Sequence, residues 1–430
     1  MKIWNQIEAL PREEIEKIQL EKLKNIVNYA YENMPLYKKK FNAVGYKSGD
    51  IQKLSDLQHL PFTTKEDFRQ NYPLGLLAVP RKKIVRIHAS SGTTGLPTVV
   101  AYTKNDLLKW SELVARMQTA AGITDEDVVQ IAFGYGLFTG GFGHHYGLEN
   151  IGAMVVPAAS GNTERQIKLM QDFGTTALIC TPSYALHIAE VAKEMGVIDN
   201  LKLKYGLFGG EPMSDGIRSK IEERLHILAT DNYGLSEVFG PGVSGECPYK
   251  AGLHIAEDFF IPEIIDEEGR VLKDGTKGEL VFTTIDREAV PVIRYRTHDI
   301  TKLNYEPCQC GRTSVRMDKV LHRNDDMLIV RGVNLFPSQI EEVLMQIDGI
   351  EPHYVIILTK ENAMDKIEVQ VEISDFLFKD KMKDLNLVHK HLKEAIEKMI
   401  NVKIDLKLVE PKTFERTAGK AKHVIDQRGN

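Results

Sequence analysis

The chain has 430 residues, which is longer than one ordinary domain and predicts two or three. Its 55 Lys and Arg residues against 60 Asp and Glu residues leave a formal net charge of −5, which argues against a general nucleic-acid binder. The amino-terminal residues lack the apolar core of a signal peptide, and no run approaches 18 apolar residues, so we expect a cytoplasmic protein without a membrane helix.

The first half of the sequence changes from a helical pattern to an alternating one. Residues 1–60 have apolar positions at helical spacing between charged ones. Short apolar runs at 128–133, 153–158 and 176–181 then read as buried strands, and the amphipathic stretches 104–122 and 163–174 as helices. Strands that alternate with helices predict a largely parallel α/β sheet.

The second half indicates two further units. Runs within residues 260–300, including a strand expected at 291–296, look like hairpins and predict an antiparallel subdomain. Beyond a hinge at 322–327 we expect a small α+β domain with a helix at 337–347, strands at 352–359, 366–374 and 402–410, and a lysine-rich helix at 378–400. The predicted fold is a large α/β domain over residues 1–323 and a small α+β domain over residues 324–430.

The strongest local feature is a run of small residues after the strand expected at 84–89. Its members are Ser90, Ser91, Gly92, Thr93, Thr94 and Gly95. Glycines let the backbone approach a ligand closely, and exposed N–H groups and hydroxyls can surround a polyanion. The Walker pattern is absent, and a flexible surface turn is an equal alternative on composition alone.

Three later segments carry candidate nucleotide ligands. The first two supply Gly210, Glu211 and Pro212, and then Asn232, Tyr233, Gly234 and Glu237. A tyrosine can stack on a base, and a carboxylate suits a Mg²⁺ ion that is bound to phosphates. Asp299 could accept hydrogen bonds from ribose hydroxyls, or it could instead pair with Arg294, Arg296 or Arg323. Taken singly, each segment reads more readily as an ordinary loop.

Taken together and in this order, the motifs resemble those of the adenylate-forming acyl-CoA synthetase superfamily. SSGTTG, YGLSE, GELVFTT, YRTHD, DDMLIVRGVN and GKAK follow one another across residues 90–422. FGYGLFTGGFGHHYG at 133–147 and GLHIAEDFFIPEIID at 252–266 are more particular to its phenylacetate–CoA ligase branch. The resemblance implies a two-step reaction, in which a carboxylate and ATP give an acyl-adenylate and pyrophosphate, and coenzyme A then displaces AMP to form a thioester.

The resemblance also implies roles for the candidate residues. Residues 90–95 would hold the pyrophosphate end of ATP, Gly210, Glu211 and Pro212 would flank adenine, and Tyr233 would stack on it. Glu237 would ligate Mg²⁺, while Asp299 and Arg323 would hold the ribose. The superfamily usually has a lysine one or three residues after the loop, where this chain has Leu96 and Thr98, which puts in doubt how tightly the loop closes.

By the same resemblance, the small domain is a mobile lid with the catalytic lysine. Lys420 would bridge the carboxylate and the α-phosphate as charge develops, with Lys422 as the alternative. Asp325 matches the pivot of the rotation between the half-reactions, and the loop after Arg331 would face coenzyme A.

An aromatic and glycine-rich segment is the candidate acid pocket. Tyr135, Phe138 and Phe142 could form an apolar slot for an aromatic ring, and His144 could line it. An aromatic cluster after a buried strand is otherwise ordinary core. We expect an arylacetic acid as the substrate.

The few cysteines predict a metal site instead of disulfides. Cys247 and His254 lie in one short loop region, and Cys308 and Cys310 lie in another. In a reducing compartment this set matches a tetrahedral structural zinc site, although three ordinary thiols are the alternative. Cys180, in an apolar run, reads as core.

The first hypothesis is therefore an ATP-dependent aryl acid–CoA ligase that uses ATP, Mg²⁺, coenzyme A and structural zinc, with a homodimer left open. One rival uses the same fold to transfer AMP to another acceptor, such as a deazaflavin. Another is an inactive nucleotide-binding protein, against which the retained Lys420 and Glu237 count.

Overall fold

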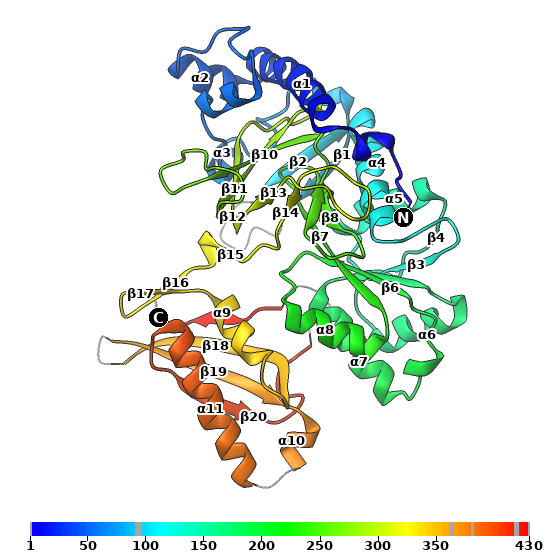
Figure 1. Cartoon of the computed structure of the whole chain (residues 1–430), viewed down its shortest axis with the longest axis vertical. Coiled ribbons are helices and arrows are strands. Elements are labelled where there is room, and N and C mark those ends of the chain that lie inside the picture. The colour runs from blue at the N-terminus through cyan, green and yellow to red at the C-terminus, as the bar shows by residue number, and fades with distance from the viewer. Residues whose placement is uncertain (1, 91–96, 362–363, 380–381, 417–420, 429–430) are drawn as a thin grey trace.

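The computed structural model describes residues 2–90, 97–361, 364–379, 382–416 and 421–428. The predicted loop residues 91–95 and Lys420 lie outside the described residues. The chain forms a large amino-terminal part and a smaller carboxy-terminal part, which lie one below the other in Figure 1. No described helix is long and apolar enough to cross a membrane.

A nine-stranded mixed sheet is the centre of the large part. Its order is β13-β14-β9-β8-β7-β6-β5-β3-β4. The strands from β4 to β7 are parallel, and those from β7 to β13 are antiparallel. The bounds are β3 (Val128–Ile131), β4 (Met154–Val156), β5 (Ala177–Cys180), β6 (Tyr205–Gly209), β7 (Leu228–Leu235), β8 (Gly240–Glu246), β9 (Leu253–Ile255), β13 (Leu303–Asn304) and β14 (Arg316–Met317). The predicted parallel α/β sheet is confirmed, and β5, which is buried along its whole length, has the continuous apolar pattern of a strand covered on both faces.

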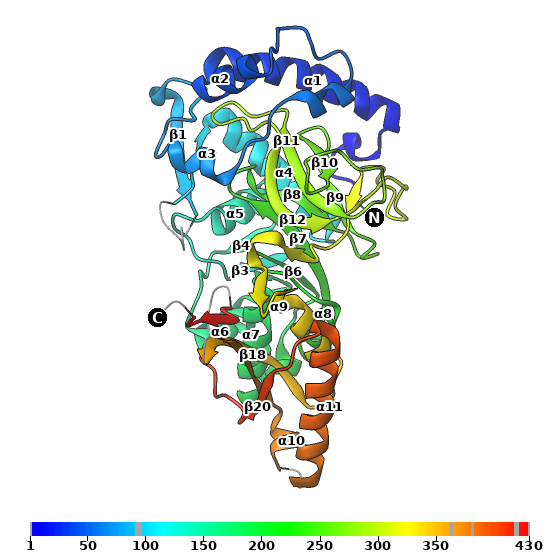
Figure 2. The same ribbon diagram turned by 90° about the vertical axis from the view of Figure 1, so that its left-hand side faces the viewer.

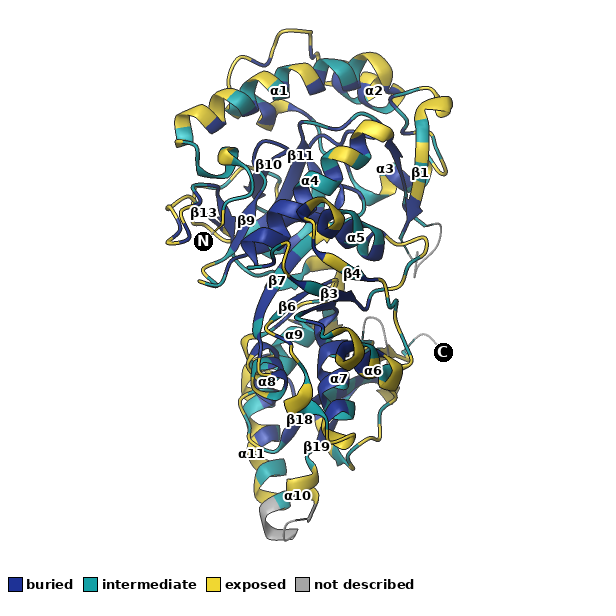
Figure 3. Cartoon of the chain, turned by 90° about the vertical axis from the view of Figure 1, so that its right-hand side faces the viewer, coloured by how far each residue is buried: buried dark blue, intermediate teal, exposed yellow. Residues whose placement is uncertain are grey.

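Helices α5 to α8 connect the parallel strands, and α4 precedes the first of them. These helices are α4 (Lys104–Ala120), α5 (Gly140–Ile151), α6 (Thr163–Phe173), α7 (Pro182–Glu194) and α8 (Asp215–Leu225), with the short turn η4 (Ile198–Asn200). Helix α4 begins at a capping box, because the Thr103 side chain accepts from the Asp106 N–H and Asp106 accepts from the Thr103 N–H. The outer faces of the helices are exposed and the strands behind them are buried (Figure 3).

The amino-terminal region is helical, as predicted. It contains η1 (Gln6–Ala9), α1 (Arg12–Asn33), α2 (Pro35–Ala43), η2 (Leu54–His59), α3 (Lys65–Gln70) and η3 (Arg81–Lys83). An antiparallel pair, β1 (Ile84–Ala89) and β2 (Val99–Thr103), follows and frames the predicted phosphate loop.

The predicted antiparallel subdomain is a sheet of order β10-β11-β12-β15. Its strands are β10 (Phe260–Ile265), β11 (Gly278–Thr284), β12 (Tyr295–Thr301) and β15 (His322–Arg323). The strand expected at 291–296 was wrong, since β12 begins only at Tyr295. Arg294 has a φ of +50°, and the N–H groups of Val292 and Ile293 bond to the side-chain hydroxyls of Thr284 and Tyr37 instead of to backbone carbonyls.

The carboxy-terminal part has its own apolar core, which includes Ile340, Ile356 and Leu392. Its elements are η5 (Asn324–Asp326), β16 (Leu328–Val330), β17 (Val333–Leu335), α9 (Pro337–Leu344), β18 (Ile350–Glu361), β19 (Met364–Ile373), α10 (Asp375–Lys379), α11 (Met382–Ile400), β20 (Asp405–Val409) and β21 (Val424–Asp426). Four of the strands form a sheet of order β20-β19-β18-β21. Of the helix expected at 378–400, residues 382–400 form α11, and α10 begins before the expected start. Strand β21 was not predicted because its three residues gain their partners only from β18.

The carboxy-terminal part lies against α7 and α8 of the large part, in both views (Figures 1 and 2). The predicted fold class is therefore confirmed. The predicted boundary between residues 323 and 324 falls between β15 and η5 and stays a prediction.

Candidate active site

The parallel half of the central sheet ends at β7, and the candidate nucleotide residues lie at the carboxyl ends of β6 and β7. Gly210, Glu211 and Pro212 follow β6, Asn232, Tyr233 and Gly234 lie in the last part of β7, and Glu237 follows β7. In open α/β sheets, ligands bind outside the carboxyl ends of the parallel strands. The Asn232 amide donates to the Phe208 carbonyl at 2.7 Å, which ties the two strand ends together.

Glycine is required at Gly234 because two backbones meet there. A Cβ atom at this position would lie 2.1 Å from the carbonyl oxygen of Gly240. Strand β7 can therefore approach β8 at this point only without a side chain.

Glu211 connects the two parts of the chain. One carboxylate oxygen accepts the Ser183 N–H at 2.6 Å, at the start of α7, and the other accepts the Ala421 N–H at 3.1 Å. Ala421 directly follows Lys420 in the sequence. Glu211 was predicted only as a neighbour of adenine, and its contact with the carboxy-terminal part was not foreseen.

Tyr233, Asp299 and Arg323 form one hydrogen-bonded group. The Tyr233 hydroxyl donates to Asp299 at 2.5 Å, and Arg323 lies 3.1 Å from the other oxygen of that carboxylate. Burial raises the pKa of Asp299, against the opposing effect of Arg323. Arg323 also pairs with Asp325, the predicted pivot, at 2.9 Å. Of the ion-pair alternatives named for Asp299, the one with Arg323 is present, and it places both candidate ribose ligands together.

Glu237 is buried, and the Arg287 side chain fixes the backbone around it by hydrogen bonds. One nitrogen of Arg287 donates to the carbonyls of Glu237 and Val238, at 2.7 and 2.6 Å. The guanidinium lies between the rings of Tyr102 and Phe239, with centroids 5.3 and 5.0 Å away. Burial lowers the pKa of Arg287, the direction expected for a cation surrounded by apolar groups. The backbone that carries Glu237 is thus fixed by a fully buried cation.

The base of the predicted phosphate loop is closed by a pair of bonds. The Ser90 N–H donates to the Thr98 carbonyl at 2.9 Å, and the Thr98 N–H donates to the Ser90 hydroxyl at 3.2 Å. His88, on β1 just before the loop, is buried among Tyr102 and Trp110.

Two of the predicted pocket residues lie against each other. The rings of Tyr135 and Phe142 meet edge to face at 5.3 Å, and the Tyr135 hydroxyl lies 3.1 Å from His145 Nδ1. Arg86 lies over the Phe142 ring, 5.3 Å from its centroid. Phe138, in contrast, is 52% exposed.

His144 lies deeper than the other predicted pocket residues. It is 1% exposed, and its ring stacks on Phe133 at 5.7 Å. Burial lowers the pKa of His144 to about 3, so the ring is neutral at physiological pH.

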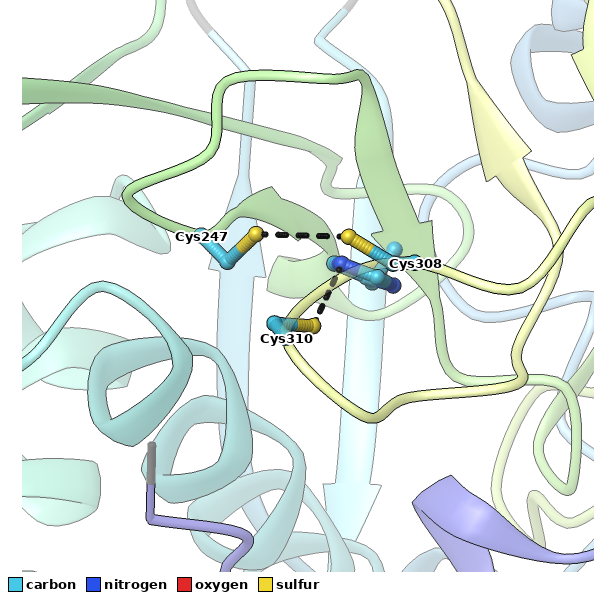
Figure 4. Close-up of side chains that lie close together, drawn as sticks. Cys247, Cys308 and Cys310 are labelled. Carbon is cyan, nitrogen blue, oxygen red and sulfur yellow. Dashed lines mark hydrogen bonds between the residues drawn. The ribbon is translucent and has the colours of Figure 1, made fainter.

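The four predicted zinc ligands meet in one place although the sequence separates them into two loops. Cys247, His254, Cys308 and Cys310 are buried, and their ligand atoms all lie within 4.8 Å of one another. The Cys247 and Cys308 sulfurs are 3.8 Å apart and face each other in Figure 4. The Cys310 sulfur lies 3.4 Å from His254 Nε2.

Polar groups around the cluster orient its members. The His254 Nδ1 lies 3.3 Å from the Ser314 hydroxyl, and Arg312 donates to the Cys310 sulfur at 3.7 Å. The hydrogen bond from Cys247, together with His254, lowers the pKa of Cys310 to about 2. The site thus favours a thiolate at Cys310, the form of cysteine that binds metals.

Comparisons with known proteins agree along nearly the whole chain. The family model of the AMP-binding enzymes matches residues 38–285, and that of the AMP-binding enzyme C-terminal domain matches residues 332–428. The phenylacetate–coenzyme A ligase of Aromatoleum evansii is 48% identical over 98% of this chain and 96% of its own. That of Thermus thermophilus is 44% identical over 98% and 99%. The chain belongs to the phenylacetate–coenzyme A ligase family of adenylate-forming enzymes. The predicted family is confirmed.

One relative has been solved in two domain arrangements, and this chain can be compared with each of them. The structure of 2-hydroxyisobutyryl-CoA ligase in its postadenylation state, with an acyl-AMP, matches with a TM-score of 0.92 at 28% identity, over 99% of this chain and 92% of that one. The same ligase in its thioesterification state, with coenzyme A, gives 0.72 at 29% identity over 98% and 92%. The two parts of this chain are therefore arranged more as in the postadenylation state.

Arg287 is the site residue of this family member that sequence reasoning missed. It stands alone in a mixed segment between β11 and β12, without a recognisable motif of its own. Its neighbours in the sequence are the charged Asp286 and Glu288, so nothing in the sequence indicates that Arg287 is buried, and only the folded chain shows which carbonyls it holds.

Proposed function

We propose that the chain is an ATP-dependent, AMP-forming aryl acid–CoA ligase whose substrate is phenylacetate or a close arylacetate. The observation that carries the proposal is the similarity to phenylacetate–coenzyme A ligases over 98% of the chain, joined to candidate nucleotide residues at the end of a parallel sheet. The enzyme forms an acyl-adenylate and then transfers the acyl group to coenzyme A.

In the adenylation step two anions meet, so positive charge has to be supplied where negative charge accumulates. The proposed ligands of ATP are residues 90–95 for the pyrophosphate end, Gly210, Glu211 and Pro212 beside adenine with Tyr233 stacked on it, and Asn232 and Gly234 on either side of Tyr233. Glu237 would bind Mg²⁺, which supplies positive charge next to the phosphates. Arg287 supports this role because it fixes the Glu237 backbone.

The ribose site is proposed at Asp299 and Arg323. Arg323 and the Tyr233 hydroxyl each bond to one oxygen of Asp299, which holds the carboxylate in one orientation. A fixed carboxylate is a ready acceptor for the two hydroxyls of a ribose, and its orientation costs no entropy at binding.

The acid pocket is proposed around Tyr135 and Phe142, with Phe138 at its exposed side and His144 beneath. Two rings in edge-to-face contact present apolar surface to a third ring. A neutral His144 adds no charge to that surface, which suits an uncharged aryl group.

The second step requires the carboxy-terminal part to move. We propose that the arrangement seen here serves adenylation, since it matches the postadenylation state of a relative better than its thioesterification state. Lys420 is the proposed catalytic lysine, Asp325 the pivot, and the loop after Arg331 the surface that faces coenzyme A. Rotation about residues 324–326 would exchange these surfaces at one active centre.

We further propose that Cys247, His254, Cys308 and Cys310 bind a structural zinc ion. Zinc bonds of about 2.3 Å to sulfur and about 2.0–2.1 Å to nitrogen, at tetrahedral angles, separate two sulfurs by about 3.8 Å and a sulfur from a nitrogen by about 3.6 Å. The corresponding distances here are 3.8 and 3.4 Å. Zinc would tie the loop after β8 to the loop before β14. A cytoplasmic location and a homodimer also stay predictions.

The proposed function is tested with the purified protein, ATP, Mg²⁺, coenzyme A and a panel of carboxylates. Pyrophosphate release with phenylacetate, and a thioester only when coenzyme A is present, are expected. Phenylacetate-dependent AMP release that does not depend on coenzyme A would sink the ligase proposal. The rival that transfers AMP to a deazaflavin would instead release pyrophosphate without phenylacetate once a deazaflavin is added, and the AMP would stay bonded to that acceptor.

The lysine assignment is tested by Lys420→Ala, with Lys422→Ala as the matched control two residues away. Lys420→Ala should abolish acyl-adenylate formation and leave thioester formation from supplied acyl-AMP largely intact. The reverse result would make Lys422 the catalytic lysine.

A further inference from the structure

The carboxy-terminal part contacts α7 through a set of ion pairs centred on Glu190. One oxygen of its carboxylate lies 2.9 Å from His353 Nε2 on β18, and the other accepts from Arg416 Nε at 3.2 Å. Burial alone would raise the pKa of Glu190, but the hydrogen bonds from His187 and His353 and the charge of Arg416 hold it far below its usual range. The carboxylate is therefore charged and joins two side chains of the carboxy-terminal part to one helix of the large part.

The Arg416 partner is itself firmly attached to the carboxy-terminal part. Its two terminal nitrogens donate to both oxygens of Glu372, at 2.9 and 2.8 Å, and Glu372 is fully buried. A bidentate pair of this kind fixes the plane of the guanidinium, so its Nε is directed at Glu190. On the neighbouring helix α8, Arg224 pairs with Glu351 at 2.7 Å and adds a second ionic contact across the same boundary.

The shapes of the two parts also fit at this boundary. A Cβ atom at Gly216, in the first turn of α8, would lie 2.3 Å from the Met345 Cβ and 2.9 Å from its Cγ. Met345, just after α9, packs against the apolar cores of both parts. Helices α8 and α9 can approach this closely only because residue 216 has no side chain.

The contacts around Glu190 hold segments that border the proposed catalytic lysine in the sequence. Arg416 precedes Lys420 by four residues, and Ala421 follows it. Arg416 is bound by Glu190 and the Ala421 N–H by Glu211, both from the large part. The arrangement that these carboxylates stabilise is the one that resembles a relative's postadenylation state.

We propose that Glu190 is a positioning residue for acyl-adenylate formation: its bonds to His353 and Arg416 select the domain arrangement of the adenylation step and have to break before the thioester step. This inference rests on the proposed function, since it assigns the two arrangements to the two half-reactions. Glu190 would then influence, through its contacts with the carboxy-terminal part, how much time the enzyme spends in each arrangement.

Two variants weaken the same arrangement by different physical means. Glu190→Gln removes the charge and keeps the shape, whereas Gly216→Ala adds a methyl group that meets Met345. Alanine favours a helix more than glycine does, so Gly216→Ala does not weaken α8 itself. The matched control is Glu194→Gln on the same helix, because Glu194 pairs across the same boundary with Lys412, at 2.5 Å, but both side chains are more than half exposed.

The half-reactions are then measured separately, as carboxylate-dependent pyrophosphate release and as thioester formation from supplied acyl-AMP and coenzyme A. Glu190→Gln and Gly216→Ala should each slow adenylation about tenfold and leave the thioester step unchanged or faster, while Glu194→Gln matches the wild type. Equal slowing of both steps, or no change in adenylation, overturns the proposal.

If the proposed ligase function is wrong, the wild type will activate no acid in the panel, and this result differs from those that overturn the role of Glu190. In that case small-angle X-ray scattering of the wild type and the two variants without substrates tests the selection of the arrangement directly. Diverging profiles support it, and identical profiles overturn it.

Discussion

His144 should make the protein less stable as the pH falls below neutrality. Its side chain is 1% exposed, stacks on Phe133, and has Gln118 Nε2 3.4 Å from its Nδ1. Burial lowers its pKa from 6.5 to about 3 because a charged imidazolium would be desolvated there. The folded chain therefore holds this ring neutral at pH values where the unfolded chain protonates it.

The size of the effect follows from the two pKa values. Between about pH 6.5 and 3 the unfolded state binds a proton that the folded state does not, so stability is complete above this window and is lost as the pH falls through it. At pH 5, which is 1.5 units below the unfolded value, His144 should lower the free energy of unfolding by about 2 kcal/mol.

The test compares the wild type with His144→Asn, in which the amide oxygen occupies about the position of Nδ1. Urea unfolding at pH 7 and pH 5 is followed by tryptophan fluorescence, because Trp4 and Trp110 both belong to the large part. The wild type should lose about 2 kcal/mol more than the variant between the two pH values. The exposed His59, changed to Asn, is the control and should leave the wild-type loss unchanged.

A direct readout removes any ambiguity from the other histidines. The ring signal of His144, assigned by its absence in the variant, should not shift in NMR spectra between pH 8 and pH 5. A midpoint near pH 6.5, or equal losses of stability in wild type and variant, would refute the assignment of a buried neutral ring.

Two further predictions concern the zinc cluster and the ribose site. Elemental analysis should find about one zinc per chain in the wild type and in Cys180→Ala, whose cysteine is buried elsewhere in the core, but none in Cys310→Ser. Wild-type protein without metal would contradict the zinc site. Asp299→Asn should raise KM for ATP about tenfold, because a hydrogen bond to a charged group is replaced by one to a neutral group, whereas Asp318→Asn, at a more exposed carboxylate, should not. An unchanged KM in Asp299→Asn would remove that residue from the nucleotide site.

The family and the main elements of the fold could be read from the sequence because they depend on local patterns. Buried parallel strands such as β5 are continuous apolar runs, and α4 and α6 have amphipathic spacing with recognisable caps. The strand expected at 291–296 was wrong because the N–H groups of Val292 and Ile293 bond to side-chain hydroxyls, and one of these, that of Tyr37, comes from a distant part of the chain.

For the candidate site, too, the sequence predicted some features and the tertiary structure decided others. Residue types and motif order were enough to select Asp299, Arg323 and the four possible zinc ligands, since the chemistry of a ligand is a property of the residue itself. Their assembly was decided by the tertiary structure, which brings Cys247 to 3.8 Å from Cys308 and lets Tyr233 donate to Asp299.

Arg287 and Glu190 were beyond the reach of the sequence altogether. An arginine or a glutamate on an ordinary segment reads as a surface charge, because that is where most such residues lie. Only the packing of distant elements shows that Arg287 is buried and donates to the Glu237 carbonyl. The same holds for the bonds of Glu190 to His353 and Arg416. The sequence thus determined which chemistry this chain can perform, and the tertiary structure decided which charges hold the reacting groups and the two domains in place, because burial and pairing depend on contacts between residues far apart in the chain.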